Sequence, residues 1–248
     1  MNAIQPTSNR RPVAALALVF LWLTAISPAY ADDDPVDLSG TWRVDYVTTT
    51  TIKIPVIDDF QTVNRAVLVA EIEQDDETID MVTRVCSLEI DSDMPLVRSK
   101  APPEFGENLP EVQRSGRLRQ RNGEWELQIA PKWQTLGVNL DDPENDDLPD
   151  NDDDPRVYDH EGDGNPGGTI VIEGAIDGEI YVIQKSWDQW RGRIRSQNRI
   201  EGILRWETQQ SVVGATHRIL RRQPRATPHP DQKKNLFRMT RVRSEPPC

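Results

Sequence analysis

The chain has 248 residues, a formal net charge of −12 and two cysteines. Most of the negative charge lies in residues 141–163, which contain twelve acidic residues against the single Arg156. The acidity is therefore local, which argues against a generally repulsive surface, and two cysteines are too few to define a disulfide framework.

The N-terminal segment has the pattern of a secretory signal peptide. Arg10 and Arg11 precede an apolar run at residues 12–26, and Ala29-Tyr30-Ala31 provides a cleavage site of small residues. The apolar run is shorter than the about 20 residues that a membrane-spanning helix needs. We expect residues 1–31 to be removed and the mature chain, residues 32–248, to be periplasmic or extracellular and not membrane-spanning.

Alternation of apolar and polar residues predicts strands through the first half of the mature chain. Asn122-Gly123 separates the clearest pair, because both residues tolerate the positive φ of a two-residue hairpin turn. Asp75-Asp76 predicts another turn, and the proline-rich segment 101–110 predicts a loop. The expected strands are 39–46, which 48–57 continues, then 62–74, 77–91, a short one at 95–100, 112–121, and 124–130, which 132–140 extends.

The same rhythm resumes after the acidic stretch. Asp177-Gly178 predicts a second hairpin, and residues 223–232 predict a proline-bearing connection. No segment has the 3.6-residue periodicity of a helix. The expected strands are 169–176, 179–187, 193–198, 201–213, 216–222 and 236–243.

About eight to ten strands in hairpin order predict an all-β fold, namely an antiparallel β-barrel with one long acidic loop at residues 141–168. A sandwich of two sheets is the alternative. Residues 32–248 would form a single domain. The seven tryptophans would either fill the interior or line a cavity.

The sequence Leu38-Ser39-Gly40-Thr41-Trp42 resembles the Gly-x-Trp start of lipocalin-like barrels. In that family the tryptophan closes the lower end of the barrel at its first strand. The resemblance implies a barrel that carries a small apolar ligand. A second lipocalin motif of the Thr-Asp-Tyr type is absent from the sequence.

The end of the acidic stretch resembles the calcium loops of the EF-hand, dockerin and thrombospondin type-3 families. Calcium takes six to eight oxygen ligands, and carboxylates at alternate positions before a glycine can surround one ion. Ile170 stands where a full EF-hand has a bidentate glutamate, so a complete EF-hand is not expected. The candidate ligands are Asp159, Glu161, Asp163 and Asn165, with Asp152 and Asp154 as additional candidates. His160 lies inside this loop and would either hydrogen-bond to a metal ligand or bind a zinc ion itself.

Two further features leave alternatives open. Cys86 and Cys248 would form a disulfide in an oxidising compartment, or Cys86 would be a buried thiol. Residues 185–243 contain 15 basic residues against four acidic ones; we interpret them as outward strand faces, some facing the acidic loop, and not as a nucleic-acid-binding surface.

Three functions follow as expectations. The first is an exported calcium-binding β-barrel without catalytic activity. The second is a lipocalin-like carrier of an apolar ligand, and the third is a hydrolase acting on cell-envelope material. The sequence contains none of the common nucleophile, zinc-protease or phosphate-loop motifs.

Overall fold

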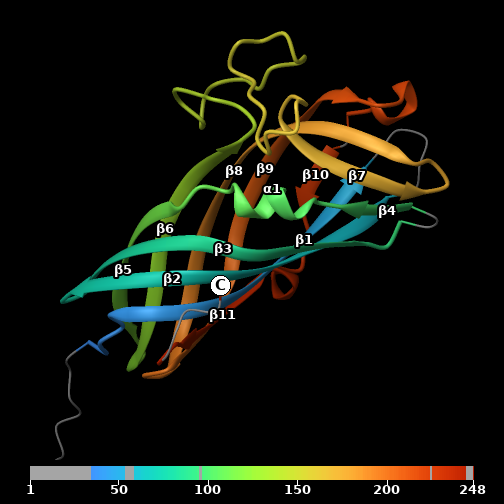
Figure 1. Cartoon of the computed structure of the whole chain (residues 1–248). Coiled ribbons are helices and arrows are strands. Elements are labelled where there is room, and N and C mark those ends of the chain that lie inside the picture. Colours follow the sequence, from blue (N-terminus) through green and yellow to red (C-terminus); the bar gives the residue numbers. More distant parts are fainter. Residues whose placement is uncertain (1–34, 54–58, 95–96, 224, 244–247) are drawn as a thin grey trace, which may run out of the picture. The chain divides into compact units, whose positions relative to one another are not determined.

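Eleven strands pair into one antiparallel sheet (Figure 1). The computed structural model describes residues 35–53, 59–94, 97–223, 225–243 and 248. All of them belong to one compact unit, Pro35–Cys248. The expected signal peptide, residues 1–31, lies outside the described residues.

Eight of the strands close into a ring. Its order is β8-β6-β5-β3-β2-β1-β11-β9, and pairing between β8 and β9 completes it. The all-β, antiparallel, barrel-like prediction is therefore confirmed, with one sheet in place of the two of a sandwich. The ring strands are β1 (Gly40–Lys53), β2 (Phe60–Asp75), β3 (Thr78–Ser92), β5 (Val112–Arg121), β6 (Glu124–Leu136), β8 (Gly178–Ser196), β9 (Arg199–Ala215) and β11 (Leu236–Arg241).

Three short strands and three short helical segments complete the fold. The strand β7 (Gly168–Gly174) pairs with one end of β8, β4 (Val97–Lys100) pairs with β7, and β10 (Arg225–Pro228) pairs with β1. The helical segments are α1 (Pro103–Glu107) and the 3₁₀ turns η1 (Arg218–Leu220) and η2 (Gln232–Lys234). None of the helices in the described part of the chain is long and apolar enough to cross a membrane.

Of the three predicted hairpin turns, one forms as expected and two differ in position or length. Asn122 and Gly123 have φ of 54° and 79°, as the predicted turn requires. The first turn falls at Asp76-Glu77, one residue later than expected, because Asp75 still pairs with Thr78. The hairpin of β7 and β8 forms, but Gly178 already belongs to β8 and pairs with Ile172, so the connection is longer than two residues.

Several element boundaries differ from the sequence expectations, four of them by more than two residues or in the type of element. The long strand β8 joins the two expected strands 179–187 and 193–198, because the inward carboxylate of Asp188 finds partners inside the ring. The strand β6 continues past Pro131 through a register shift between Ile129 and Lys132, where the missing proline N–H breaks no pairing. Residues 216–222 contain η1 in place of a strand, and the expected connection 223–232 contains β10.

The helix α1 was not predicted, since five residues are too short to show helical periodicity. Pro103 stands in its first turn, where a missing N–H costs nothing. Phe105 is its buried residue and packs with Leu136, Val182 and Val212 in a small apolar cluster. The helix therefore contributes a side wall to one end of the ring.

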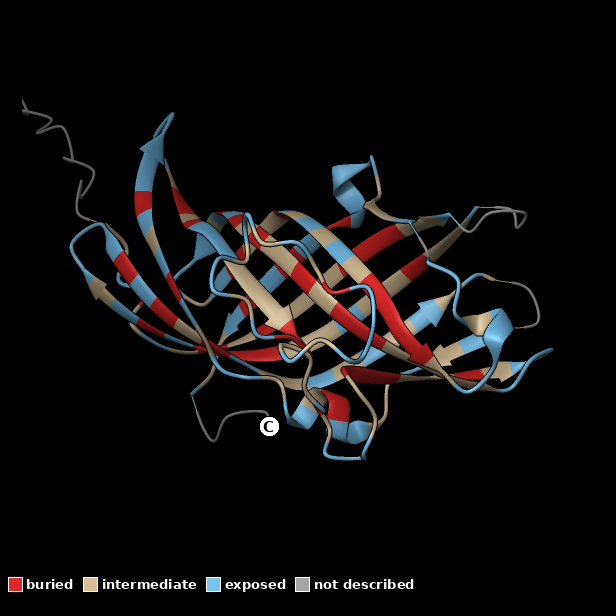
Figure 2. Cartoon of the chain, turned by 90° about the horizontal axis from the view of Figure 1, so that it is seen from above, coloured by how far each residue is buried: buried red, intermediate tan, exposed pale blue. Residues whose placement is uncertain are grey.

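The main core fills the other end of the ring. Trp42, Trp190 and Phe237 are its largest fully buried side chains, and the buried positions alternate along the strands (Figure 2). Trp42 Nε1 donates a hydrogen bond to the Leu38 carbonyl at 2.8 Å, and the guanidinium of Arg241 lies 4.5 Å from the centre of its ring. This end of the ring is therefore packed solid.

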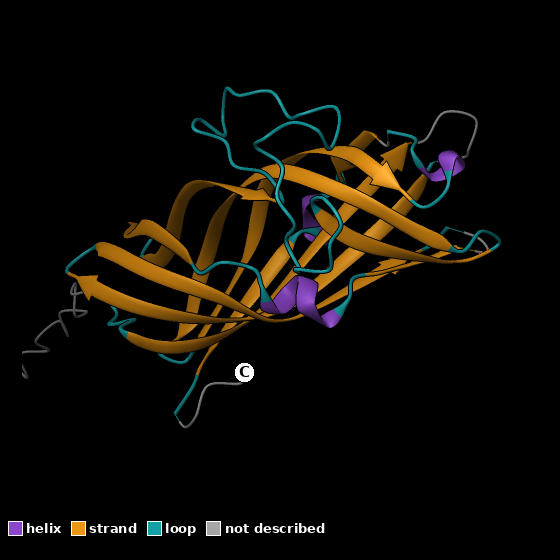
Figure 3. Cartoon of the chain, turned by 45° about the horizontal axis from the view of Figure 1, so that its top comes forward, coloured by secondary structure: helices purple, strands orange, loops and turns teal. Residues whose placement is uncertain are grey.

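The acidic stretch forms a loop region of turns and bends against the outer face of the ring (Figure 3). Val138 packs with Ile183 of β8 and Val213 of β9, and Leu148 lies against this cluster. Lys185 is buried beneath it, and its Nζ donates to the Asp146 carbonyl at 2.5 Å. A lysine from the basic part of the chain thus anchors the acidic loop.

Candidate ligand cavity and carboxylate cluster

A cavity of about 960 Å³ occupies the ring beyond the packed core. Such a volume is large enough for a drug-sized organic molecule. The two-residue period of the strands places alternate side chains inside, as on β8, where Gln184, Ser186 and Asp188 line the cavity. Its apolar lining includes Leu68, Val85, Leu88, Ile170, Val182 and Val212.

The cavity reaches the molecular surface near β7, β8 and η1. Ile176, in the connection between β7 and β8, and Ile219 in η1 both line it. They are also 36% and 54% exposed, which is unusual for large apolar side chains. Apolar side chains that border both the solvent and an interior cavity can form an entrance for an apolar molecule.

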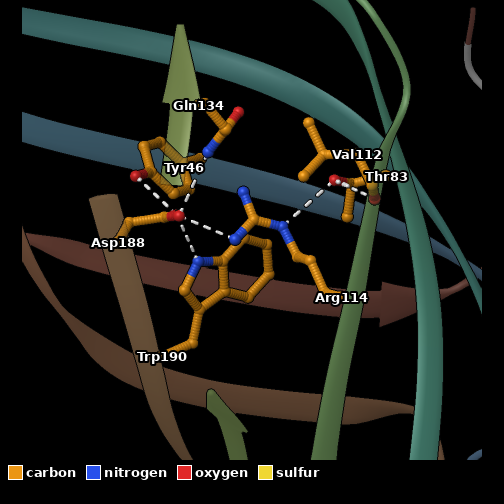
Figure 4. A network of polar contacts seen from close by, with 7 residues as sticks. All are labelled: Tyr46, Thr83, Val112, Arg114, Gln134, Asp188 and Trp190. Carbon is orange, nitrogen blue, oxygen red and sulfur yellow. Dashed lines mark hydrogen bonds and ion pairs between the residues drawn. The ribbon is translucent and has the colours of Figure 1, made fainter. Parts of the chain in front are cut away.

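A buried polar network separates the cavity from the packed core (Figure 4). At its centre the carboxylate of Asp188, on β8, accepts four hydrogen bonds. Arg114 Nη1 donates at 2.6 Å, Trp190 Nε1 at 2.6 Å, the Tyr46 hydroxyl at 3.1 Å and Gln134 Nε2 at 3.3 Å. These five residues come from four strands, β1, β5, β6 and β8, so the network fixes their relative positions.

Arg114 is the charged partner of Asp188, and both side chains are buried. Its Nε donates to the Thr83 hydroxyl at 3.3 Å, and its guanidinium carbon lies 5.0 Å from the centre of the Trp190 ring. Nη2 has no hydrogen-bond partner among the described residues, and Figure 4 shows it apart from the dashed contacts. Arg114 lines the cavity, so these N–H groups can reach a molecule inside it.

Tyr46 is held as a neutral phenol. Burial, reinforced by the negative charge of Asp188, raises the pKa of Tyr46 well above its ordinary value, although Arg114 acts in the opposite direction. Its hydroxyl therefore remains a hydrogen-bond donor to Asp188 at neutral pH. The network thus combines one cation, one anion and neutral donors, without net charge.

The acidic loop brings three of the predicted metal ligands together. Asp159, Glu161 and Asp163 each offer an oxygen, and these oxygens lie within 4.8 Å of one another, so the group could hold a metal ion. The loop also stabilises itself through the same carboxylates. Asp159 accepts hydrogen bonds from the backbone N–H groups of Gly162, Asp163 and Gly164 at 2.7, 3.2 and 2.8 Å.

Glu161 differs from its two neighbours. Its Oε1 accepts the Thr169 N–H at 3.0 Å, while its Oε2 is buried without a hydrogen-bond partner in the described structure. Burial raises the pKa of Glu161, and the Thr169 N–H only partly opposes this. Burial also raises the pKa of Asp163, but the hydrogen bonds donated by Asn165 and Thr169 outweigh this effect, so its pKa is lowered. A cation would fit the unpaired oxygen of Glu161.

The remaining candidate ligands have other roles or are exposed. The carboxylate of Asp154 binds Arg156 at 2.9 Å, and this hydrogen bond lowers the pKa of Asp154 to about 2. Asp152 is exposed, and neither it nor Asp154 belongs to the carboxylate group of the described chain. The backbone N–H of Asn165 donates to Asp163 at 2.8 Å.

His160 connects the acidic loop to α1. It is 8% exposed, its Nε2 contacts the Phe105 carbonyl at 3.1 Å, and its ring meets the Phe105 ring edge-on. Asn108 adds a donor to the His160 carbonyl at 3.2 Å. Because Phe105 offers only an acceptor, Nε2 carries the proton and is not available to a metal.

The other two sequence features are also resolved. Cys86 and Cys248 form a disulfide, with their Cα atoms 5.0 Å apart. Cys86 lies where Leu68 pairs with Val85 and Val67 pairs with Ser87, so it is the extra residue of a β-bulge. Most of the basic side chains with ion pairs face other surface acids, as do Arg199 and Arg238 at Glu201.

The residues of the polar network were missed by sequence reasoning. Arg114 lies on the inward face of β5, the same face as the apolar Leu118. Asp188 lies on the inward face of β8. A charged residue in an apolar position of the two-residue period is the signal that could have identified each one. Nothing in the sequence pairs them, because 74 positions separate them.

Comparison of the chain with protein-family models, with curated proteins and with solved structures finds no match.

Proposed function

We propose that the mature protein is an exported, lipocalin-like binding protein that holds a small apolar or amphipathic ligand inside its ring of strands. The cavity of about 960 Å³ carries this proposal. Protein interiors normally pack with few voids larger than a water molecule. A large apolar cavity is therefore a feature that a purely structural domain would not need.

Three other observations support the proposal. Trp42 and the core around it close one end of the ring, while Ile176 and Ile219 border the cavity at the surface. The disulfide between Cys86 and Cys248 suits an oxidising compartment. The ring is thus closed at one end and accessible at the other, as a carrier requires.

The hydrolase alternative has less support. The acidic residues that line the cavity in the described structure are Glu111 and Asp188. Asp188 is occupied by four hydrogen-bond donors, and Glu111 is exposed beside Arg84. A pair of carboxylates in distinct environments, as acid–base hydrolysis needs, is not assembled by these two residues.

Binding of N-phenyl-1-naphthylamine, an uncharged fluorescent apolar probe, tests the proposal. We expect saturable binding of one probe per chain, with quenching or energy transfer from the cavity tryptophans Trp133, Trp187 and Trp206. Ala66→Phe adds a ring inside the cavity and should weaken binding, whereas Arg65→Phe, on the exposed face of the same strand, should not. Absence of saturable binding, or equal binding by both variants, would overturn the proposal.

A divalent cation at Asp159, Glu161 and Asp163 is a second proposed function, with calcium as the favoured ion. It is supported by the grouping of the three oxygens and by the unpaired Oε2 of Glu161. The site lies where the loop meets β7, since Thr169 of β7 donates to both Glu161 and Asp163. A bound ion would therefore fasten the acidic loop to the strand and stabilise the folded chain.

Calorimetry and thermal melting with calcium test the second proposal. A site saturated at 100 times its dissociation constant should stabilise the fold by about 2.7 kcal/mol. Glu161→Gln should abolish this gain, while Asp152→Asn, which removes the same charge from an exposed position of the loop, should retain it. Equal calcium responses of the two variants would show only diffuse attraction to an acidic loop.

A further inference from the structure

The cavity floor presents hydrogen-bond donors without net charge. We propose that this floor selects ligands whose polar end is an uncharged oxygen acceptor, such as an ester, a ketone, an amide or an alcohol, over carboxylates with the same chain length. This inference rests on the proposed ligand-binding function. It names the chemical class of ligand that the polar network would take.

The hydrogen bonds of the network identify the available atoms. Asp188 already accepts four donors, so it has little capacity for a ligand hydroxyl. Arg114 uses Nε for Thr83 and Nη1 for Asp188, while Nη2 has no partner within the described chain. Because Arg114 lines the cavity, an acceptor oxygen on the ligand can take a hydrogen bond from Nη2. A hydrogen bond from a charged donor is stronger than one between neutral groups.

The charge balance determines which acceptor fits. The carboxylate of Asp188 lies 2.6 Å from Arg114 and neutralises it. A ligand carboxylate at Nη2 would place a second buried anion close to Asp188, and a buried charge without its own counter-charge is strongly unfavourable. An ester or ketone oxygen takes the same donors without adding charge.

The charged side chains elsewhere in the lining do not alter this balance. Glu111, Lys132 and Arg222 also border the cavity, but all three are exposed, so solvent screens their charges. Thr208 Oγ1, in contrast, is buried without a hydrogen-bond partner among the described residues and lines the same cavity. Thr208 is neutral and adds no charge to the balance.

The rest of the ligand would be an alkyl or similar apolar chain. The lining between the floor and the surface is mainly apolar, and Ile176 and Ile219 extend it to the solvent. A molecule with one neutral polar end and an apolar body therefore matches both parts of the cavity.

Displacement of N-phenyl-1-naphthylamine from the native protein by four ligands of equal chain length tests the inference. The set is methyl decanoate, decanol, decanoate at pH 8 and decane. The ester and the alcohol should bind at least about tenfold more tightly than decanoate and than decane, the ratio expected for one hydrogen bond to a charged donor. The inference is overturned if decanoate binds at least as tightly as methyl decanoate, or if decane binds as tightly as methyl decanoate and decanol. The carrier function would remain intact in either case.

Asp188→Asn should reverse the order in which decanoate and methyl decanoate bind. It keeps the size of the side chain but removes the counter-charge of Arg114, so decanoate should now bind more tightly than methyl decanoate. Glu89→Gln, which removes a charge from the exposed face of β3, should keep the native order. An unchanged order in a folded Asp188→Asn protein would contradict the inference. If Asp188→Asn does not fold, the order of the four ligands on the native protein still decides.

Failure of the two proposals is distinguishable. If the probe itself does not bind, the carrier function fails and the inference fails with it. If the probe binds and all four ligands displace it equally, only the inference fails.

Discussion

Tyr46 couples the polar network to the pH dependence of stability. Burial and the neighbouring Asp188 raise the pKa of Tyr46 well above the value near 10 of an exposed tyrosine. The contribution of the protonated phenol to stability is complete below pH 10, because both folded and unfolded chains then keep the proton. Above pH 10 the unfolded chain loses its proton first, so the free energy of unfolding should fall until the folded pKa is reached.

This prediction can be measured as a difference between two proteins. For one group, the free energy of unfolding should fall by about 1.4 kcal/mol per pH unit above pH 10. Tyr46→Phe removes that group, so urea denaturation of native and variant proteins between pH 9 and 11 should show a steeper decline for the native chain. Parallel declines would mean that Tyr46 titrates like an exposed tyrosine. The comparison cancels the contributions of the lysines and the other tyrosines.

At the scale of single elements, Gly167 fixes the junction between the acidic loop and β7. Its φ is 78°, and a Cβ there would lie 2.5 Å from the Val182 carbonyl oxygen of β8. Gly162 of the same loop has a φ of 79°, yet a Cβ there would have no atom within 4 Å among its described surroundings. The two glycines therefore separate backbone strain from steric contact.

Alanine substitutions at both glycines give a matched prediction. Gly162→Ala should cost about 1–2 kcal/mol, the strain of a left-handed residue with a Cβ. Gly167→Ala should cost more, because the Val182 backbone must also move, and it should loosen the loop against β8. Urea denaturation compares the two values. Equal losses would show that the loop does not press against the ring at Gly167.

The elements show how far sequence reasoning reaches. The two-residue period and the Asn122-Gly123 turn predicted most of the ring, because each depends on neighbouring residues. The continuity of β8 was missed, since the break at Asp188 disappears only when partners from other strands satisfy its carboxylate. The grouping of Asp159, Glu161 and Asp163 was predictable from their spacing along one loop. The Arg114–Asp188 pair was not, since it depends on how the ring closes.

At the scale of the whole described unit, the ring has two unlike halves. One half is filled by the core around Trp42, Trp190 and Phe237, and this core supplies the main apolar stabilisation. The other half contains the cavity, whose walls include α1 and whose outer surface is covered in part by the acidic loop. The packed half can hold the fold while the hollow half remains free to bind.

The position of a bound ligand tests the carrier proposal most directly. A crystal structure of the protein with methyl 10-bromodecanoate would locate the bromine atom by its anomalous scattering. The carrier proposal predicts the bromine inside the ring. The further inference adds that the ester lies near Arg114 and the bromine on the side of Ile176 and Ile219. A cavity closed by inward side chains, or bromine found only on the outer surface of the ring, would contradict the carrier proposal.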